Sequence, residues 1–157
     1  MYTQGDEQQA TRRHDGHEDR WARPLYLPAA THAYLERAAT SLREAITSAD
    51  VPERYALAHV AALRATAALL AARAQPVVAG RRRQTNAWVL LAEVAPELAE
   101  WATFFAAGAP KRAAAEAGSR RAVSAREADD LVRDADRFLA LVETMLGLTT
   151  HLPIQVA

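Results

Sequence analysis

The sequence predicts an all-α fold, and three observations support this prediction. Alanine, which has the highest helix propensity and little preference for strands, accounts for 38 of the 157 residues. Apolar residues recur at intervals of three and four along several segments, which is the period of a helix packed on one face. Only six glycines and seven prolines interrupt these segments. A chain of this length is expected to form one domain with a core of four or five helices.

Three segments divide the chain. Residues 1–24 are expected to be a disordered tail, because they mix charges of both signs with no helical apolar period. Residues 25–148 hold the predicted helices and form the domain. The apolar C-terminal tail, residues 149–157, either folds back onto the domain or binds another chain as a short linear segment.

The first two helices are predicted to be long. The first covers residues 30–48, and the second covers residues 51–74, with Asp50 and Glu53 at the positions of a capping box. Pro76 is expected to end the second helix. A row of small residues along this helix would let another helix approach closely: Ala58, Ala61, Ala65, Ala68 and Ala72.

The third helix is predicted to begin near Thr85, a residue type that suits an N-cap. At Pro96 either this helix kinks, or a new helix starts with the proline in its first turn. Gly108 and Pro110 are expected to stop the helix, because glycine followed by proline is typical of helix C-termini. Residues 111–117 are then expected to form a short turn.

The last helix is the clearest in the sequence. Ser124 and Glu127 match a capping box at its start, the apolar period runs to about residue 146, and Gly147 closes it. The face opposite the apolar residues carries oppositely charged pairs three and four residues apart. The helical segments together predict an antiparallel bundle of four or five helices.

Composition excludes several classes of function. Acidic and basic residues number 19 each, so no net charge attracts the whole protein to nucleic acid. The chain has no cysteine, which excludes disulfides, thiol catalysis and cysteine metal sites. No apolar run is long enough to span a membrane and no signal peptide follows Met1, so the cytoplasm is the expected location. The histidines and acids of residues 14–19 fit no known structural metal site, and we expect neither a metal nor another cofactor.

Three segments resemble HEPN domains. Residues 53–70, an alanine-lined helix that ends in an alanine-leucine run, are similar to the second HEPN helix. Residues 124–139 resemble the last HEPN helix. Residues 87–105, with their two tryptophans and a proline, are similar to an actinobacterial HEPN subfamily known as the SAV_6107 type. The resemblance covers roughly residues 30–146.

This resemblance implies a four- to five-helix bundle that is usually a dimer. Many HEPN domains are metal-independent RNases with an Arg, four to six residues, then His signature. In that chemistry the histidine acts as general acid or base, and the arginine stabilises the charge on the phosphorane. The subfamily resemblance also suggests a setting in DNA-damage tolerance.

One instance of the signature is present, because His59 follows Arg54 by five residues. It lies at the start of the second predicted helix, whereas active HEPN RNases carry the motif near the start of the last helix. Five residues rotate a helix by about 140°, so the two side chains do not share a face. Two interpretations stay open. The pair is catalytic, or His59 is a packing residue and Arg54 pairs with a nearby acid.

Basic residues form the other candidate site. The densest run of basic residues is 81–83. If this run lies near the other basic side chains in space, together they would contact the phosphates of a nucleic acid. The alternative is a solvated loop. The candidate nucleic-acid-binding residues are Arg81, Arg82, Arg83, Lys111, Arg112, Arg120 and Arg121.

Two functional hypotheses follow. The first is a non-catalytic, dimeric HEPN-like module that binds a nucleic-acid or protein partner, with no membrane involved. The second is a metal-independent endoribonuclease that uses Arg54 and His59. Adjacent Phe104 and Phe105 point in different directions on a helix, so one of them is expected to leave the core and meet a partner.

Overall fold

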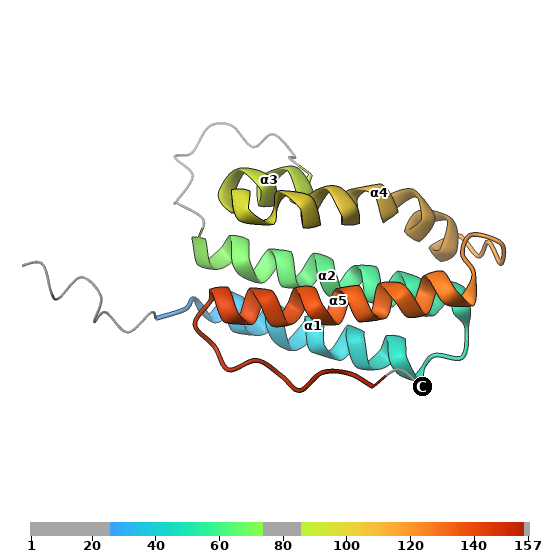
Figure 1. Ribbon diagram of the computed structural model, residues 1–157, viewed down its shortest axis with the longest axis horizontal. Coiled ribbons are helices and arrows are strands. Elements are labelled where there is room, and N and C mark those ends of the chain that lie inside the picture. The colour runs from blue at the N-terminus through green and yellow to red at the C-terminus, as the bar shows by residue number, and fades with distance from the viewer. Residues whose placement is uncertain (1–25, 74–85, 156–157) are drawn as a thin grey trace, which may run out of the picture.

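The computed structural model describes residues 26–73 and 86–155, and all regular structure within them is helical (Figure 1). The elements are α1 (Ala29–Thr47), α2 (Val51–Arg73), α3 (Ala87–Val94), the 3-10 turn η1 (Pro96–Leu98), α4 (Ala99–Glu116) and α5 (Ala125–Met145). The predicted all-α fold is confirmed. The predictions made for residues 1–24, Pro76 and Thr85 lie outside the described residues.

Helix α2 is the centre of the bundle and contacts α1, α3, α4 and α5. Helices α3 and α4 lie on one side of it, and α1 and α5 lie on the other (Figure 1). The four long helices alternate in direction along the chain (Figure 1). This is the antiparallel bundle that the helical segments predicted.

The contact between α1 and α2 is built from small residues. Thr31 of α1 donates from Oγ1 to the carbonyl of Ala68 on α2 at 3.2 Å, which is possible only where the two backbones approach closely. Alanines of both helices are almost completely buried in the core: Ala38 and Ala45 on α1, and Ala58, Ala61, Ala62, Ala65 and Ala68 on α2. Four of the five small residues in the predicted row, Ala58, Ala61, Ala65 and Ala68, are therefore buried in the core, and Ala72 is partly buried.

An aromatic cluster fills the rest of the core. The ring of Phe105 on α4 stacks with Trp88 of α3 at a centroid distance of 5.3 Å and with Trp101 at 5.7 Å. It also meets Phe138 of α5 edge-on at 5.1 Å. Phe105 is fully buried, whereas its neighbour Phe104 remains 45% exposed, so one of the pair leaves the core as expected.

The structure shows which residue caps α3 and whether Pro96 kinks a helix or begins a new one. Asn86 caps α3, because its side-chain oxygen accepts a hydrogen bond from the backbone N–H of Trp88 at 2.9 Å. Pro96 begins η1, which leads directly into α4. The second alternative at Pro96 is therefore correct, since proline in a first turn loses no helical hydrogen bond.

Helix α4 does not stop at Gly108 and Pro110, as the sequence predicted, and residues 111–116 are helical. The helix ends instead at Glu116, two residues before Gly118, which adopts a left-handed φ of 89°. There the N–H groups of Gly118 and Ser119 bond back to the carbonyls of Ala115 and Ala114, the pair of bonds that terminates a helix. Pro110 removes only its own hydrogen bond and is exposed, so the helix continues past it.

Gly108 serves packing rather than termination. A Cβ at this position would lie 2.8 Å from the hydroxyl oxygen of Tyr55 and 3.3 Å from Cδ2 of His59. Because glycine lacks that atom, α4 approaches α2 at the level of His59. Ser124, Glu127 and Gly147 start and end α5 as predicted.

Candidate functional site

Arg54 lies in the first turn of α2, and three of its donors are used internally. Nη1 donates to Oδ1 of Asp129 on α5 at 2.6 Å. Nε and Nη2 donate to the carbonyl of Ser48, just after α1, at 3.2 and 3.1 Å. The side chain is only 20% exposed. Arg54 thus ties the turn between α1 and α2 to α5, a structural role for a bidentate, charge-assisted donor.

His59 lies five residues further along α2 and is fully buried. Its Nε2 is 2.8 Å from the carbonyl oxygen of Phe105, which can only accept, so Nε2 carries the proton. Nδ1 then accepts a long hydrogen bond of 3.4 Å from Nη1 of Arg112. Burial lowers the pKa of His59, and the charge of Arg112 lowers it further, which outweighs the effect of the Phe105 carbonyl. The imidazole is therefore neutral, and both nitrogens are used.

The structure does not bring Arg54 and His59 together. The guanidinium contacts Ser48 and Asp129, whereas the imidazole contacts Phe105 and Arg112, so the two groups have no common partner among the described residues. A general acid or base needs a ring nitrogen within reach of the substrate. His59 offers none, because its ring is enclosed between α2, α3 and α4 and packs edge-on against Trp88 at 5.6 Å.

Three of the candidate nucleic-acid-binding residues are paired with acids at one end of the bundle. Lys111 bonds to Glu127, and its ammonium lowers the pKa of that carboxyl to about 2. Arg120 bonds to Asp50 at 2.6 Å, which lowers the pKa of Asp50. Arg112 lies 3.7 Å from Glu116. These pairs reduce the positive potential that phosphates would meet.

Four members of the candidate group remain, and the structure describes only one of them. Arg121 is exposed in the turn between α4 and α5. Residues 81–83 lie outside the described part of the chain. The nearest described residue before them, Arg73, is at the opposite end of α2 from the Arg120–Asp50 pair. Within the described residues, the predicted patch is therefore small.

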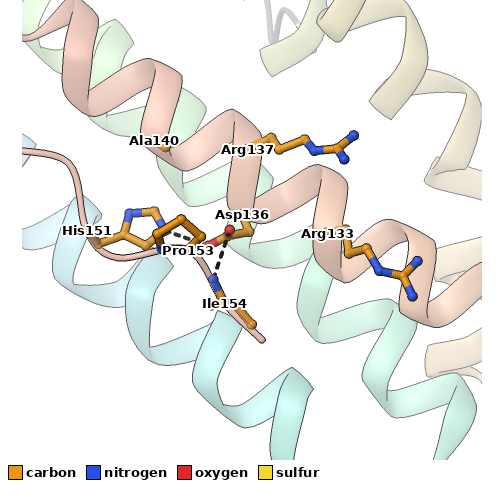
Figure 2. A pocket seen from close by; sticks show the side chains of 7 residues that line it. All are labelled: Arg133, Asp136, Arg137, Ala140, His151, Pro153 and Ile154. Carbon is orange, nitrogen blue, oxygen red and sulfur yellow. Dashed lines mark hydrogen bonds and ion pairs between the residues drawn. The ribbon is translucent and has the colours of Figure 1, made fainter. Parts of the chain in front are cut away.

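A hollow of about 370 Å³ lies where the C-terminal segment folds back along α5 (Figure 2). It is lined by Arg133, Asp136, Arg137, Ala140, His151, Pro153 and Ile154. His151 and Asp136 point toward one another across it (Figure 2). The sequence interpretation did not single out His151, because its partners precede it by eight and 15 residues and meet it only through the fold-back.

His151 is held by two carboxylates at once. Nε2 lies 2.5 Å from Oδ1 of Asp136, and Nδ1 lies 2.9 Å from Oε2 of Glu143. Both acids are almost buried, with 12% and 13% of their side chains exposed. Burial alone lowers the pKa of His151, but the hydrogen bonds and charges of Asp136 and Glu143 outweigh it and raise the pKa above 6.5.

This arrangement is suited to holding a segment rather than to catalysis. Neither ring nitrogen of His151 is available to a substrate while both bonds are made. In the part of the chain that the structure describes, no group of three or more His, Cys, Asp or Glu side chains is placed to hold a metal ion.

A second hollow, of about 350 Å³, lies between α3 and α4 and is mostly apolar. Its lining consists of Trp88, Val89, Ala92, Glu93, Ala102, Thr103 and Ala106. Val89, which lines this hollow, is 49% exposed. Phe104 on α4 does not line the hollow and is 45% exposed. The outer surface of α3 and α4, called here the α3–α4 face, therefore presents large apolar side chains to solvent.

The helices of the bundle alternate in direction, the central helix is lined with alanines, and the last helix begins with a capping box. This is the arrangement expected of HEPN domains. The sequence model of the SAV_6107-like HEPN family matches residues 45–143, from the end of α1 nearly to the end of α5. Neither a curated protein nor a solved structure matches the chain. Since the family match covers more than half of the residues, the chain belongs to the SAV_6107-like HEPN family.

Proposed function

We propose that this chain is a non-catalytic HEPN module, an accessory factor that forms a dimer and acts by binding a partner. The observation that carries the proposal is the internal use of Arg54 and His59. Arg54 holds α2 to α5, and His59 donates to a buried backbone carbonyl of α4. An RNase site would need both groups at a shared, open surface.

The α3–α4 face supports the dimeric part of the proposal. HEPN domains are usually dimers, the half-exposed Val89 lines an apolar hollow between α3 and α4, and Phe104 is a second exposed large apolar side chain on α4. Interfaces are enriched in aromatic side chains of this kind. A second copy of the chain is therefore the occupant that we propose for the face.

A protein is the partner that the charges favour over nucleic acid. Lys111, Arg112 and Arg120 are engaged by acids, and the net charge is zero, so the described residues offer phosphates little free positive charge. The proposed setting in DNA-damage tolerance and the cytoplasmic location rest on the family resemblance and on the composition.

An RNA cleavage assay in EDTA tests the proposal. We expect the purified protein to leave structured RNA intact, with the same background as an Arg54→Ala/His59→Ala variant. Because His59 is buried and its loss disturbs the core, Arg54→Gln is the variant that separates chemistry from folding. Arg126, which is 91% exposed on α5, supplies the matched control Arg126→Gln.

Cleavage by the wild-type protein that is lost in folded Arg54→Gln but kept in Arg126→Gln would overturn the proposal in favour of an endoribonuclease. Fluorescence anisotropy measures binding to single-stranded RNA or DNA. Tight binding with a steep salt dependence would show that the partner is a nucleic acid and not a protein.

A further inference from the structure

The segment after α5 reverses direction and is held against that helix by side-chain bonds. Residues 148–155 run back from the C-terminal end of α5, on the side of the bundle where α1 lies (Figure 1). The backbone N–H of His151 donates to Glu143 at 2.9 Å. The backbone N–H of Ile154 donates to Asp136 at 3.3 Å, a bond drawn in Figure 2. Residues 148–155 are called the C-terminal strap below.

The two side-chain bonds of His151 require a particular proton count. A carboxylate can only accept hydrogen bonds, and a neutral imidazole has one N–H to donate. Both ring nitrogens of His151 lie within 2.9 Å of carboxylate oxygens. Both bonds form together only when the ring carries two protons and a positive charge. A neutral ring would turn a lone pair toward one nearly buried acid.

We propose that the C-terminal strap is a proton-controlled clamp, closed on α5 when His151 is charged and released when His151 loses its proton. The cluster has one cation between two acids, so it is net negative when the ring is charged and doubly negative when it is neutral. Two nearly buried carboxylates without their cation repel the strap's remaining acceptors and draw in water.

The charged groups around His151 set the direction of the response. Asp136 and Glu143 face the ring from α5, and Arg133 and Arg137 of the same helix line the hollow. Arg133 and Arg137 pair with Asp130 and Asp134, at 2.6 and 3.7 Å, rather than with Asp136. Among the described residues, no ion pair joins α1 to His151.

Closure of the C-terminal strap is favoured at low pH. Because the pKa of His151 is raised above 6.5 in the closed state, the bound proton favours closure fully below pH 6.5. As pH rises from 6.5 to the raised pKa, the ratio of closed to open strap falls by up to about tenfold per pH unit.

Release changes what the surface of the bundle presents. Leu148 and Ile154 pack against the core in the closed state, whereas Leu152 is already 88% exposed. An open strap uncovers the strip beneath Ile154 and frees a short apolar segment around Pro153. The clamp therefore switches a local apolar surface without unfolding the helices.

Distance measurement between two spin labels tests the clamp in the full chain. The chain has no cysteine, so Leu152→Cys on the strap and Ala107→Cys, exposed on α4, give two unique labels. Double electron–electron resonance is recorded on samples frozen at about pH 6, below the ordinary pKa of histidine, and at about pH 9. We expect one narrow distance distribution at the lower pH and a broad one at the higher pH.

Three variants in this labelled chain make the result specific. His151→Gln should give the broad distribution at both pH values, and His151→Lys, which keeps its charge to about pH 10, should give the narrow one at both. His32→Gln, an exposed histidine on α1, should respond like the wild type. A wild-type distribution that does not change with pH, or a His151→Gln variant that keeps the wild-type response, would overturn the proposal.

Discussion

His59 and His151 respond to burial in opposite ways because their neighbours differ. His59 faces a carbonyl and an arginine, so burial dominates and its pKa is lowered below 6.5. His151 faces two carboxylates, which overcome the same effect of burial and raise its pKa above 6.5. Residue type alone therefore does not fix the charge of either ring.

The first prediction concerns the pH dependence of stability. The folded chain holds His59 neutral, whereas the unfolded chain protonates it near pH 6.5, so stability is lost as pH falls below that value. We expect the free energy of unfolding of the wild type to fall more steeply between pH 6.5 and about pH 5 than that of His59→Gln. One proton contributes at most about 1.4 kcal/mol per pH unit. Urea unfolding at a series of pH values measures both slopes.

His32→Gln is the matched control for this experiment, because His32 is exposed on α1. Its slope should equal that of the wild type. Equal slopes for the wild type and His59→Gln would show that the buried ring is protonated in the folded state, contrary to the tautomer that we assign.

Gly108 gives the second prediction at the residue scale. Alanine at this position gains about 1 kcal/mol of helix propensity, but its Cβ would lie 2.8 Å from Tyr55 Oη and 3.3 Å from the buried ring of His59. We expect the overpacking to outweigh the gain, so Gly108→Ala should lower the free energy of unfolding by about 1–2 kcal/mol. Chemical denaturation measures the difference.

A double-mutant cycle identifies the clash. Tyr55→Phe removes the hydroxyl oxygen, so Gly108→Ala in that background should lose less stability than in the wild type. An unchanged loss would mean that the ring of His59, and not Tyr55, is the obstacle. Stabilisation by Gly108→Ala would show that helix propensity alone governs the position.

At the scale of elements, the same residue type has different effects in α4 and η1. Pro110 lies inside α4, where it removes a hydrogen bond, whereas Pro96 begins η1, where its missing N–H costs nothing. We expect Pro110→Ala to raise the free energy of unfolding by about 1–3 kcal/mol, and Pro96→Ala to change it by less than about 0.5 kcal/mol. Both prolines are exposed, so packing changes little.

Thermal and urea unfolding of the two variants check this difference. Equal effects of Pro110→Ala and Pro96→Ala would contradict it. A loss of stability in Pro110→Ala would mean that a bend at Pro110 is needed for the contacts that α4 makes beyond it, such as the Lys111–Glu127 pair.

Elements were predictable from sequence where their signals are local. The capping box at Ser124 and the C-terminal Gly147 each involve atoms within a few residues, and each can be predicted from the sequence. At Pro96 the sequence left a kink and a new helix both open, and the structure shows the new start. The end of α4 could not be. Gly108 looks like a stop signal, but its real constraint is the side chain of Tyr55, which is 53 residues earlier in the chain.

The candidate site depended even more on contacts between distant residues. The sequence offered an exposed arginine paired with an acid as one alternative for Arg54, and its partner Asp129 lies 75 residues away. It could not show that His59 bonds a carbonyl of α4, or that a tail histidine meets two acids of α5. These are tertiary contacts, and no local pattern encodes them.

On the scale of the whole molecule, composition alone does not decide whether α2 is a membrane-spanning helix or a core helix, and the fold does. By length and hydropathy alone, α2 is apolar enough to cross a membrane. In the bundle it contacts four other helices, and more than half of its most apolar window is buried. Its apolar character is therefore that of a core helix, which needs the alanines for close packing on both sides.

The assembly of two copies gives the last prediction. If the α3–α4 face is the dimer interface, a charge placed there is buried without a partner, whereas a charge on another exposed apolar residue is not. We expect Phe104→Arg to weaken dimerisation by about thirtyfold, the effect of losing an aromatic hot spot worth about 2 kcal/mol. Val89→Arg should act in the same direction, because its side chain is also half exposed on that face.

Sedimentation equilibrium measures the association, and circular dichroism confirms that each variant keeps its helices. Leu152→Arg is the matched control, since Leu152 is 88% exposed on the C-terminal strap and lies outside the α3–α4 face. It should leave the dimer unchanged. A wild type that sediments as a monomer, or equal weakening by Leu152→Arg and Phe104→Arg, would show that this face does not bind a second copy.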